Sequence, residues 1–201
     1  MRMLPIAASV LALGAAACSG DQAESTTPPT DGTTPATNQT AAQRAPVGAS
    51  ANVALADGEG ASAGTATLRQ GPQGVVIRVE ATGLTPGWHG IHLHAVGTCE
   101  GPAFQSAGSH VHGGAGEAVH GLLNEGQSDS GDLPNVYADA QGRVNAEVFT
   151  TFARLADSGG GEHLLDEDGS ALLIHASPDD HTSQPIGGSG DRVACGVIQA
   201  G

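Results

Sequence analysis

The chain has 201 residues, and its formal charge of -14 comes from 21 acidic and only 7 basic residues, all of which are arginine. Contacts with phosphate need a basic surface, so this balance argues against nucleic acid as a partner. The length suits one folded domain with a single hydrophobic core.

The N-terminal residues 1–17 have the pattern of a secretory signal peptide. Arg2 precedes an apolar run from Leu4 to Ala17, which is too short to span a bilayer permanently. Cys18 follows a run of alanines in a way that resembles the cleavage site of bacterial lipoproteins, and we expect Cys18 to carry the lipid. Ordinary cleavage that leaves a free thiol stays open. We therefore expect an exported protein on the periplasmic side of a bacterial envelope, which meets a membrane only through this lipid.

Residues 18–48 are predicted to form a disordered tether behind Cys18. They are rich in Thr, Pro, Ala, Gln and Ser and contain almost no large apolar side chain. Such a composition cannot offset the entropy that is lost on ordering. The folded domain is expected over residues 49–201.

The domain is predicted to be all-β. Short β-compatible runs end at turn residues such as Asp57-Gly58 and Gln141-Gly142, and no long segment shows helical periodicity. Many short strands with tight turns favour a sandwich or a barrel. The runs cover residues 51–56, 64–69, 75–81, 89–95, 143–150, 171–175 and 192–198.

Two segments, residues 98–134 and 176–191, are too long and too rich in glycine to be strands. Long ordered loops inside a compact domain usually serve a function. We therefore expect these two loops to help build the functional site.

Histidines indicate what that site holds. His92 and His94 are two apart in a predicted strand, so both imidazoles share one face. His110 and His120 fall in the first long segment, and His175 ends an apolar run. Imidazole nitrogens without a shell of hard oxygen ligands suit copper and argue against calcium or magnesium. The sequence therefore predicts a metal site.

The pattern closely resembles the copper/zinc superoxide dismutase family from about residue 51 to residue 201. Each block alone is weak evidence, but their order and spacing together are specific. The blocks are GIHLH (90–94), FQSAGSH (104–110), HG (120–121), GDLPN (131–135), HASPDD (175–180) and GSGDRVACGVI (188–198). The resemblance implies an eight-stranded Greek-key β-barrel or sandwich with two long functional loops. It also implies an enzyme that converts two superoxide anions and two protons to O2 and H2O2.

The resemblance assigns copper to His92, His94, His110 and His175, with His110 also facing a neighbouring zinc ion. It places Arg192 beside the open copper position. Superoxide is a small anion, and a guanidinium keeps its charge and offers several donors. Arg192 and His110 are thus the expected catalytic residues, the first attracting the substrate and the second carrying a proton.

Zinc is expected on His110, His120 and Asp132, but the fourth ligand departs from the family pattern. A histidine stands there in the family, whereas this chain has Asp129. A carboxylate oxygen is an acceptable zinc ligand. His112 is an alternative fourth ligand, and a weak or empty zinc site is a third possibility.

Three further residues match supporting positions of the family. Asp179 matches a carboxylate that orients one copper ligand and one zinc ligand, and such outer contacts fix the imidazole tautomer. Cys99 and Cys195 match the disulfide that ties the first long loop to the last strand. An exported chain can keep such a bond.

Two other functions compete with the enzyme. A copper carrier or store favours soft Met or Cys ligands, but Met1 and Met3 are the only methionines and would leave with the signal peptide. Arg192 would also have no purpose in a store. An inactive homologue kept as a surface protein is favoured only by Asp129. The sequence leaves open whether the protein is a monomer or a homodimer.

Overall fold

The computed structural model describes residues 48–114, 116–127 and 129–201. The predicted signal peptide, Cys18 and the tether up to residue 47 lie outside the described residues. In the part that is described, no helix has the length and apolar character needed to cross a membrane.

Over these ranges the regular secondary structure is almost wholly β-strand, which confirms the all-β prediction. Seven strands form one antiparallel sheet in the order β5-β10-β11-β1-β2-β3-β7, and two smaller pairs are β4-β6 and β8-β9. The strands are β1 (Ser50–Asp57), β2 (Ser62–Gly71), β3 (Gly74–Ala81), β4 (Gly87–His89), β5 (Ile91–His94), β6 (Val136–Ala138), β7 (Val144–Thr150), β8 (Ala153–Arg154), β9 (Glu162–His163), β10 (Ala171–His175) and β11 (Arg192–Ala200).

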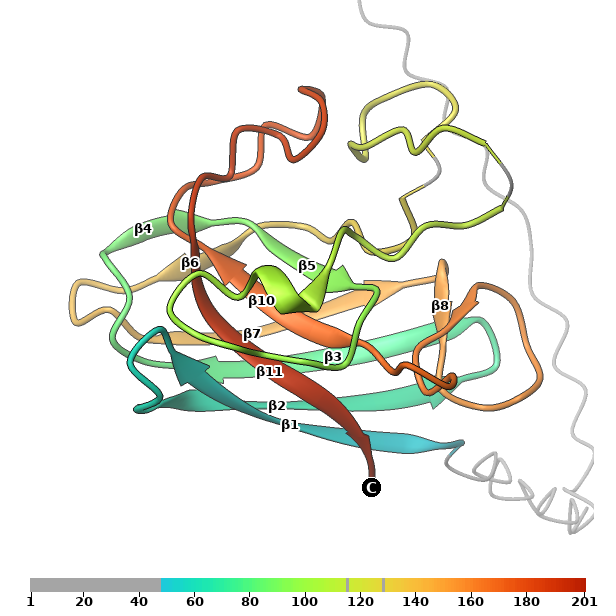
Figure 1. Ribbon diagram of the computed structural model, residues 1–201, viewed down its shortest axis with the longest axis horizontal. Helices are drawn as coiled ribbons and strands as arrows, with labels where there is room; N and C mark the ends of the chain where they lie inside the picture. The colour runs from blue at the N-terminus through green and yellow to red at the C-terminus, as the bar shows by residue number, and fades with distance from the viewer. Residues whose placement is uncertain (1–47, 115, 128) are drawn as a thin grey trace, which may run out of the picture. The chain divides into compact units, whose positions relative to one another are not determined.

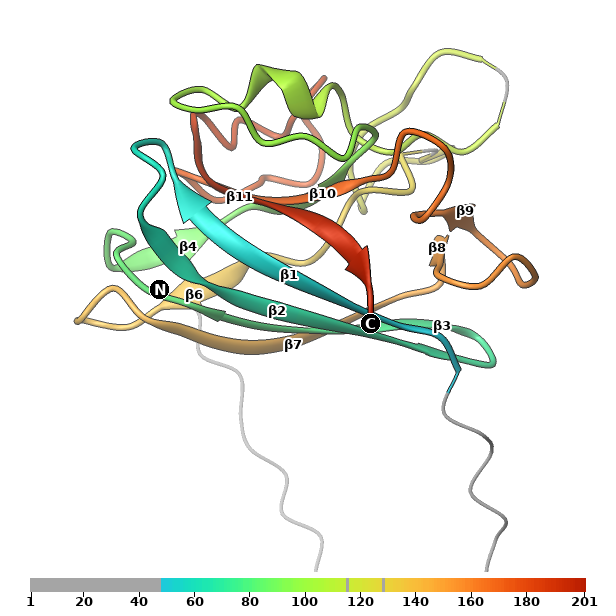
Figure 2. The same ribbon diagram turned by 60° about the horizontal axis from the view of Figure 1, so that its bottom comes forward.

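The large sheet curls around the core, so that β10 and β11 lie across from β3 and β7 (Figure 2). Strand β3 shows how the sequence sets this up, because Val75, Ile77 and Val79 are buried while Arg78 and Glu80 are exposed. Such alternation is typical of an antiparallel strand with one face in the core. The largest buried core side chains include Leu55, Leu68, Ile77, Ile91, Leu93, Leu133, Leu172 and Ile174.

The run predicted as one strand over residues 89–95 is two strands that meet at Gly90. β4 pairs with β6, whereas β5 pairs with β10. The Gly90 N–H donates to the Ser177 carbonyl at 2.9 Å, and its carbonyl accepts from the His175 N–H at 2.8 Å. A Cβ on Gly90 would lie 2.7 Å from Ser189 Oγ. The chain therefore changes sheets at a residue that has no room for a side chain, and β6 is too short to leave a pattern in the sequence.

Both long loops are present, as the sequence predicts. Residues 95–135 join β5 to β6 and include the short 3-10 helix η1 (Gln105–Ala107), and residues 176–191 join β10 to β11. Figure 2 shows most of both loops on the side of β10 that faces away from β2 and β3, and Figure 1 shows the second loop and the later part of the first loop on one side of the sheet. The sheet order thus places the predicted histidine strand beside the strand that ends in His175, underneath both loops.

Candidate metal centre

Four buried histidines from three segments meet at the edge of the sheet. In the register of β5 and β10, His92 lies opposite Leu173 and His94 lies opposite Ala171. An isolated antiparallel bridge pairs His94 with His110, which brings the first long loop to the same place. His175 ends β10. Each histidine offers one ligand atom, and these four atoms lie within 4.8 Å of one another. We call these residues the copper group: His92, His94, His110 and His175.

Each ring of the copper group has one nitrogen that is held and one that is free. The free nitrogens are buried and have no hydrogen-bond partner among the described residues; they are His92 Nδ1, His94 Nε2, His110 Nε2 and His175 Nε2. The held nitrogens are His92 Nε2 at 2.8 Å from Asp179 Oδ2, His94 Nδ1 at 3.0 Å from the Gly108 carbonyl, His110 Nδ1 at 3.1 Å from Asp132 Oδ1, and His175 Nδ1 at 3.1 Å from the Gly190 carbonyl. Buried polar atoms are rarely left without a partner, so the four free nitrogens fit a metal ion between them.

Burial keeps three of these imidazoles neutral. It lowers the pKa of His92 to about 4, even though Asp179 acts in the opposite direction. It lowers the pKa of His94 to about 2 and that of His175 to about 3, and nearby positive charge adds to both shifts. A neutral imidazole is the form that binds a metal. The site is therefore ready for a cation at neutral pH without first losing protons from these rings.

A second group of ligand atoms adjoins the first through His110, whose Nδ1 faces away from the copper group. Ligand atoms of His92, His110, His120 and Asp132 lie within 4.8 Å of one another. Of these, the His92 Nε2 is already hydrogen-bonded to Asp179. Asp132 Oδ1 lies 3.1 Å from His110 Nδ1 and 2.7 Å from His120 Nδ1. Asp129 Oδ2 lies 3.5 Å from the first of these nitrogens and 3.9 Å from the second.

This second group is strongly charged. Burial lowers the pKa of His120, but hydrogen bonds with Asp132 and Asp179 outweigh it and raise that pKa to about 10. Burial likewise raises the pKa of Asp132, but hydrogen bonds with His110 and His120 hold it well below its usual range. Carboxylates that stay ionised beside imidazoles are a donor set that suits a zinc ion.

Asp179 connects the two groups from behind. Its Oδ2 accepts from His92 Nε2 at 2.8 Å, and its Oδ1 lies 3.2 Å from His120 Nε2. Asn135 holds the backbone of Asp179, because its amide donates to the Asp179 carbonyl at 2.8 Å and its Oδ1 accepts from the Asp179 N–H at 2.9 Å. One carboxylate thus orients a ring of each group, at the place that the sequence predicted for Asp179.

Known proteins share this arrangement of sequence and fold. The family model described as copper/zinc superoxide dismutase (SODC) matches residues 62–198. The chain belongs to the copper/zinc superoxide dismutase family.

Individual members of the family agree with this assignment. The chain is 51% identical over 150 residues to a superoxide dismutase [Cu-Zn] of Caulobacter vibrioides, covering 75% of this chain and 86% of that protein. The solved structure of a copper/zinc superoxide dismutase from Brucella abortus has a TM-score of 0.61 at 28% identity and covers 75% of this chain and 99% of that one. The solved structure of a superoxide dismutase-like protein from Bacillus subtilis has a TM-score of 0.67 at 34% identity, and the match covers 73% of this chain and 96% of that one.

In this superoxide dismutase family member, Arg192 lies beside the copper group. It stands opposite His175 in the register of β10 and β11, and both residues line a cleft of about 630 Å3. Its Nη1 donates to the Phe104 carbonyl at 2.6 Å, and its Nη2 donates to the Gly108 carbonyl at 2.7 Å. The first long loop therefore holds the guanidinium at the mouth of the cleft.

The predicted disulfide is confirmed. Cys99 and Cys195 are bonded, with their Cα atoms 5.7 Å apart. Cys195 is fully buried and packs in a small apolar cluster with Phe104 and Leu173. The bond anchors the loop that supplies the carbonyl partners of Arg192 to β11, the strand that begins with Arg192.

Two residues that support the ligands carry no signal that sequence reasoning used. His89, to which the sequence analysis gives no role, is buried, with its Nδ1 2.6 Å from the His175 carbonyl and its Nε2 2.8 Å from the Thr85 carbonyl. Gln184 holds the backbone of His120. Histidines and amides are common in loops, and only the folded chain shows what these two touch.

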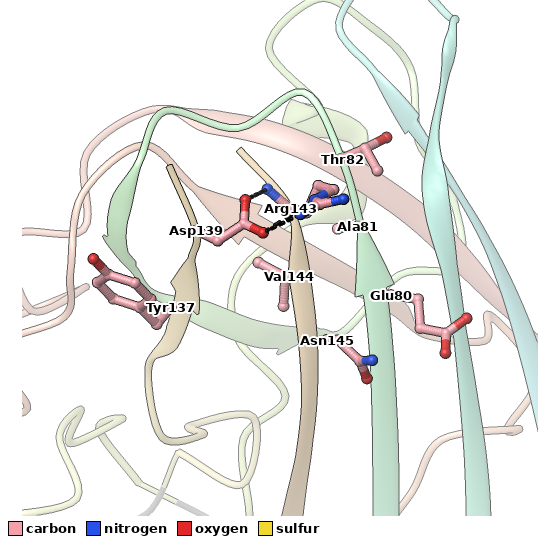
Figure 3. A pocket seen from close by; sticks show the side chains of 8 residues that line it. All are labelled: Glu80, Ala81, Thr82, Tyr137, Asp139, Arg143, Val144 and Asn145. Carbon is pink, nitrogen blue, oxygen red and sulfur yellow. Dashed lines mark hydrogen bonds and ion pairs between the residues drawn. The ribbon is translucent and has the colours of Figure 1, made fainter. Parts of the chain in front are cut away.

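A further hollow of about 530 Å3 contains none of the clustered histidines (Figure 3). Its lining includes Arg143, but that guanidinium is already paired with Asp139 at 2.9 Å. Asp139 offsets the charge of this guanidinium, and the lining contains neither of the two histidine groups.

Proposed function

We propose that this protein is a superoxide dismutase that binds copper through His92, His94, His110 and His175. The observation that carries the proposal is the set of four converging ring nitrogens. Each is buried and has no hydrogen-bond partner in the described part of the chain, while the other nitrogen of the same ring is held. Four imidazole nitrogens suit Cu(II). Family membership supports the same activity.

The reaction takes two superoxide anions and two protons to O2 and H2O2, and bound copper supplies the one-electron oxidation and reduction that link the two halves. Arg192 attracts the anion into the cleft, where its fixed positive charge works against the net charge of -14. His110 would take up and deliver a proton at Nε2, the nitrogen that faces the copper position, because its Nδ1 faces Asp132 on the zinc side.

We propose that zinc binds to His110, His120, Asp132 and Asp129. The first three are close together, and Asp129 Oδ2 is near both imidazoles. This is a set of two imidazoles and two carboxylates, which zinc accepts. Zinc performs no redox chemistry, so its role is to fix the loop and to tune His110.

Metal analysis of the purified protein, together with a superoxide-decay assay, tests the function. We expect one copper per chain and fast dismutation, both lost in His94→Ala and both kept in the control His163→Ala, which removes a histidine outside the two groups. Copper bound without dismutation would indicate a store, and no copper at all would overturn the proposal.

We further propose that the protein is exported and anchored by a lipid on Cys18. The signal-like sequence before Cys18 and the disulfide, which is typical of exported proteins, support this. Expression in a bacterium with labelled palmitate should give labelled protein in the membrane fraction, and Cys18→Ser should release it unlabelled. Label retained by Cys18→Ser would contradict the anchor.

A further inference from the structure

Asp129 stands where the family resemblance predicts a histidine, and its carboxylate faces two ways. Oδ2 faces the other three proposed zinc ligands, His110, His120 and Asp132 (the zinc group), 3.5 Å from His110 Nδ1 and 3.9 Å from His120 Nδ1. Oδ1 faces away from that group and lies 3.4 Å from His112 Nδ1. One oxygen is therefore available to a metal while the other meets a histidine.

The backbone places His112 opposite Asp129. The two residues form an isolated antiparallel bridge inside the first long loop. Beside it, the Gly131 N–H donates to the Val111 carbonyl at 2.9 Å. Side chains directly opposite each other in such a pair are close neighbours. The approach of the imidazole to the carboxylate therefore follows from the main-chain pairing of the loop.

The polar atoms of the pair are shielded from water. Asp129 is only 4% exposed, and the His112 side chain is 24% exposed. Asp129 Oδ1 and both ring nitrogens of His112 are buried and have no hydrogen-bond partner among the described residues, although the ring and the carboxylate are in ion-pair range. A buried carboxylate oxygen without a donor is costly, and a carboxylate that binds a metal is itself usually held by a donor. His112 Nδ1, 3.4 Å from Asp129 Oδ1, is a donor within reach of that oxygen.

We propose that His112 is a positioning residue that holds Asp129 as the fourth zinc ligand. This rests on the proposed function of the zinc group. The Nδ1–H of His112 donates to Asp129 Oδ1 and aims Oδ2 at the metal. The inference decides between the two candidates for the fourth ligand: Asp129 binds zinc, and His112 acts only through Asp129.

Zinc affinity, measured by competition with a chromophoric chelator, tests the proposal. His112→Ala should weaken zinc binding about 10- to 100-fold, as removal of an outer partner does in other metal sites. His112→Asn should stay close to wild type, because the asparagine amide nitrogen takes the place of Nδ1 and donates the same hydrogen bond. The matched control is His163→Ala, which should leave zinc affinity unchanged.

The same His112 substitution in an Asp129→His variant tests whether His112 acts through Asp129. In Asp129→His the fourth ligand is an imidazole that needs no partner at His112, so adding His112→Ala should change zinc affinity less than threefold. The proposal would be overturned if His112→Ala lowered zinc affinity equally in both backgrounds or did not lower it at all. It would also be overturned if His112→Asn lost as much zinc affinity as His112→Ala, or if the wild-type protein bound no zinc. The expected zinc pattern without dismutation would overturn the proposed function and leave this inference standing.

Discussion

The side chain of Gln184 pairs with both backbone groups of His120. Its Oε1 accepts from the His120 N–H at 2.9 Å, and its Nε2 donates to the His120 carbonyl at 2.8 Å. Asn124 donates to the same carbonyl at 2.6 Å. Gln184 belongs to the loop between β10 and β11, and His120 belongs to the loop between β5 and β6. The second loop thus positions a histidine of the first.

Replacing Gln184 with Ala should therefore weaken both zinc binding and the contact between the loops. Two hydrogen bonds at about 1 kcal/mol each predict a loss of roughly 2 kcal/mol in the free energy of unfolding. Denaturant unfolding of the metal-loaded protein measures this. The control is Gln73→Ala, at an exposed turn position, which should behave as wild type. Equal stability of the two variants would show that the pairing contributes nothing.

Two adjacent glycines provide a sharper comparison. Gly187 and Gly188 both have left-handed φ angles, of 59° and 68°. A Cβ on Gly187 would lie 1.7 Å from Asp179 Oδ1 and 2.9 Å from His120 Nε2, whereas a Cβ on Gly188 would meet no atom of the described residues within 4 Å. Both alanine variants carry the backbone cost of about 1–2 kcal/mol for that conformation. Only Gly187→Ala also displaces the carboxylate that orients a ring of each metal group.

We accordingly expect Gly187→Ala to lose copper and zinc, and Gly188→Ala to keep both with a modest loss of stability. Metal content by mass spectrometry and thermal unfolding of both variants check this. If Gly188→Ala loses metal as readily as Gly187→Ala, backbone strain and not the position of Asp179 controls the site.

These contacts mark the limit of what the sequence predicted. The alternation of His92 and His94 followed from the period of a strand, and the loop boundaries followed from glycine and length. The register that sets Leu173 against His92 did not, because β5 and β10 are far apart in the chain and only folding selects their pairing. Gln184 could not be singled out either, since an amide in a polar loop looks the same whether or not it holds a ligand. The resemblance supplied the site residues that local pattern could not.

The histidine pKa shifts predict how the stability of the metal-free protein depends on pH. The folded pKa values of His92, His94 and His175 are lowered to about 4, about 2 and about 3, below the usual value near 6.5. Unfolding then takes up protons below about pH 6.5, so stability falls as the pH drops toward 4. The folded pKa of His120 is raised to about 10. Unfolding releases that proton above about pH 6.5, so stability also falls as the pH rises toward 10.

Metal-free protein should thus be most stable near neutral or slightly acidic pH, with losses on both sides. Bound zinc should remove the loss of stability at alkaline pH, because a His120 ring that binds zinc through Nδ1 no longer holds a proton there. Denaturant midpoints from pH 4 to pH 10, with and without zinc, measure the loss of stability on both sides. A loss of stability at alkaline pH that persists in the zinc-loaded protein would contradict the assignment of His120 to the zinc group.

Substitution of Arg192 tests whether the local charge in the cleft or the net charge of the chain sets the rate at which superoxide reacts. Arg192→Gln and Arg143→Gln each remove one positive charge from a chain at -14, but only Arg192 lines the cleft with His175. Arg143 is on the surface, paired with Asp139. A cation in a narrow cleft raises the association rate of an anion by about 10-fold or more. We expect Arg192→Gln to lower kcat/KM by at least about tenfold and Arg143→Gln to leave it unchanged.

Salt provides the second arm of this test. Raising the ionic strength shortens the screening length to about 3 Å at 1 M, which weakens the attraction between Arg192 and superoxide. The difference in kcat/KM between wild type and Arg192→Gln should therefore become smaller as salt is added, while the kcat/KM of Arg143→Gln follows that of wild type throughout. Stopped-flow superoxide decay at several salt concentrations measures all three proteins. Equal losses in the two arginine variants would mean that net charge, and not the guanidinium held by the Phe104 and Gly108 carbonyls, sets the rate.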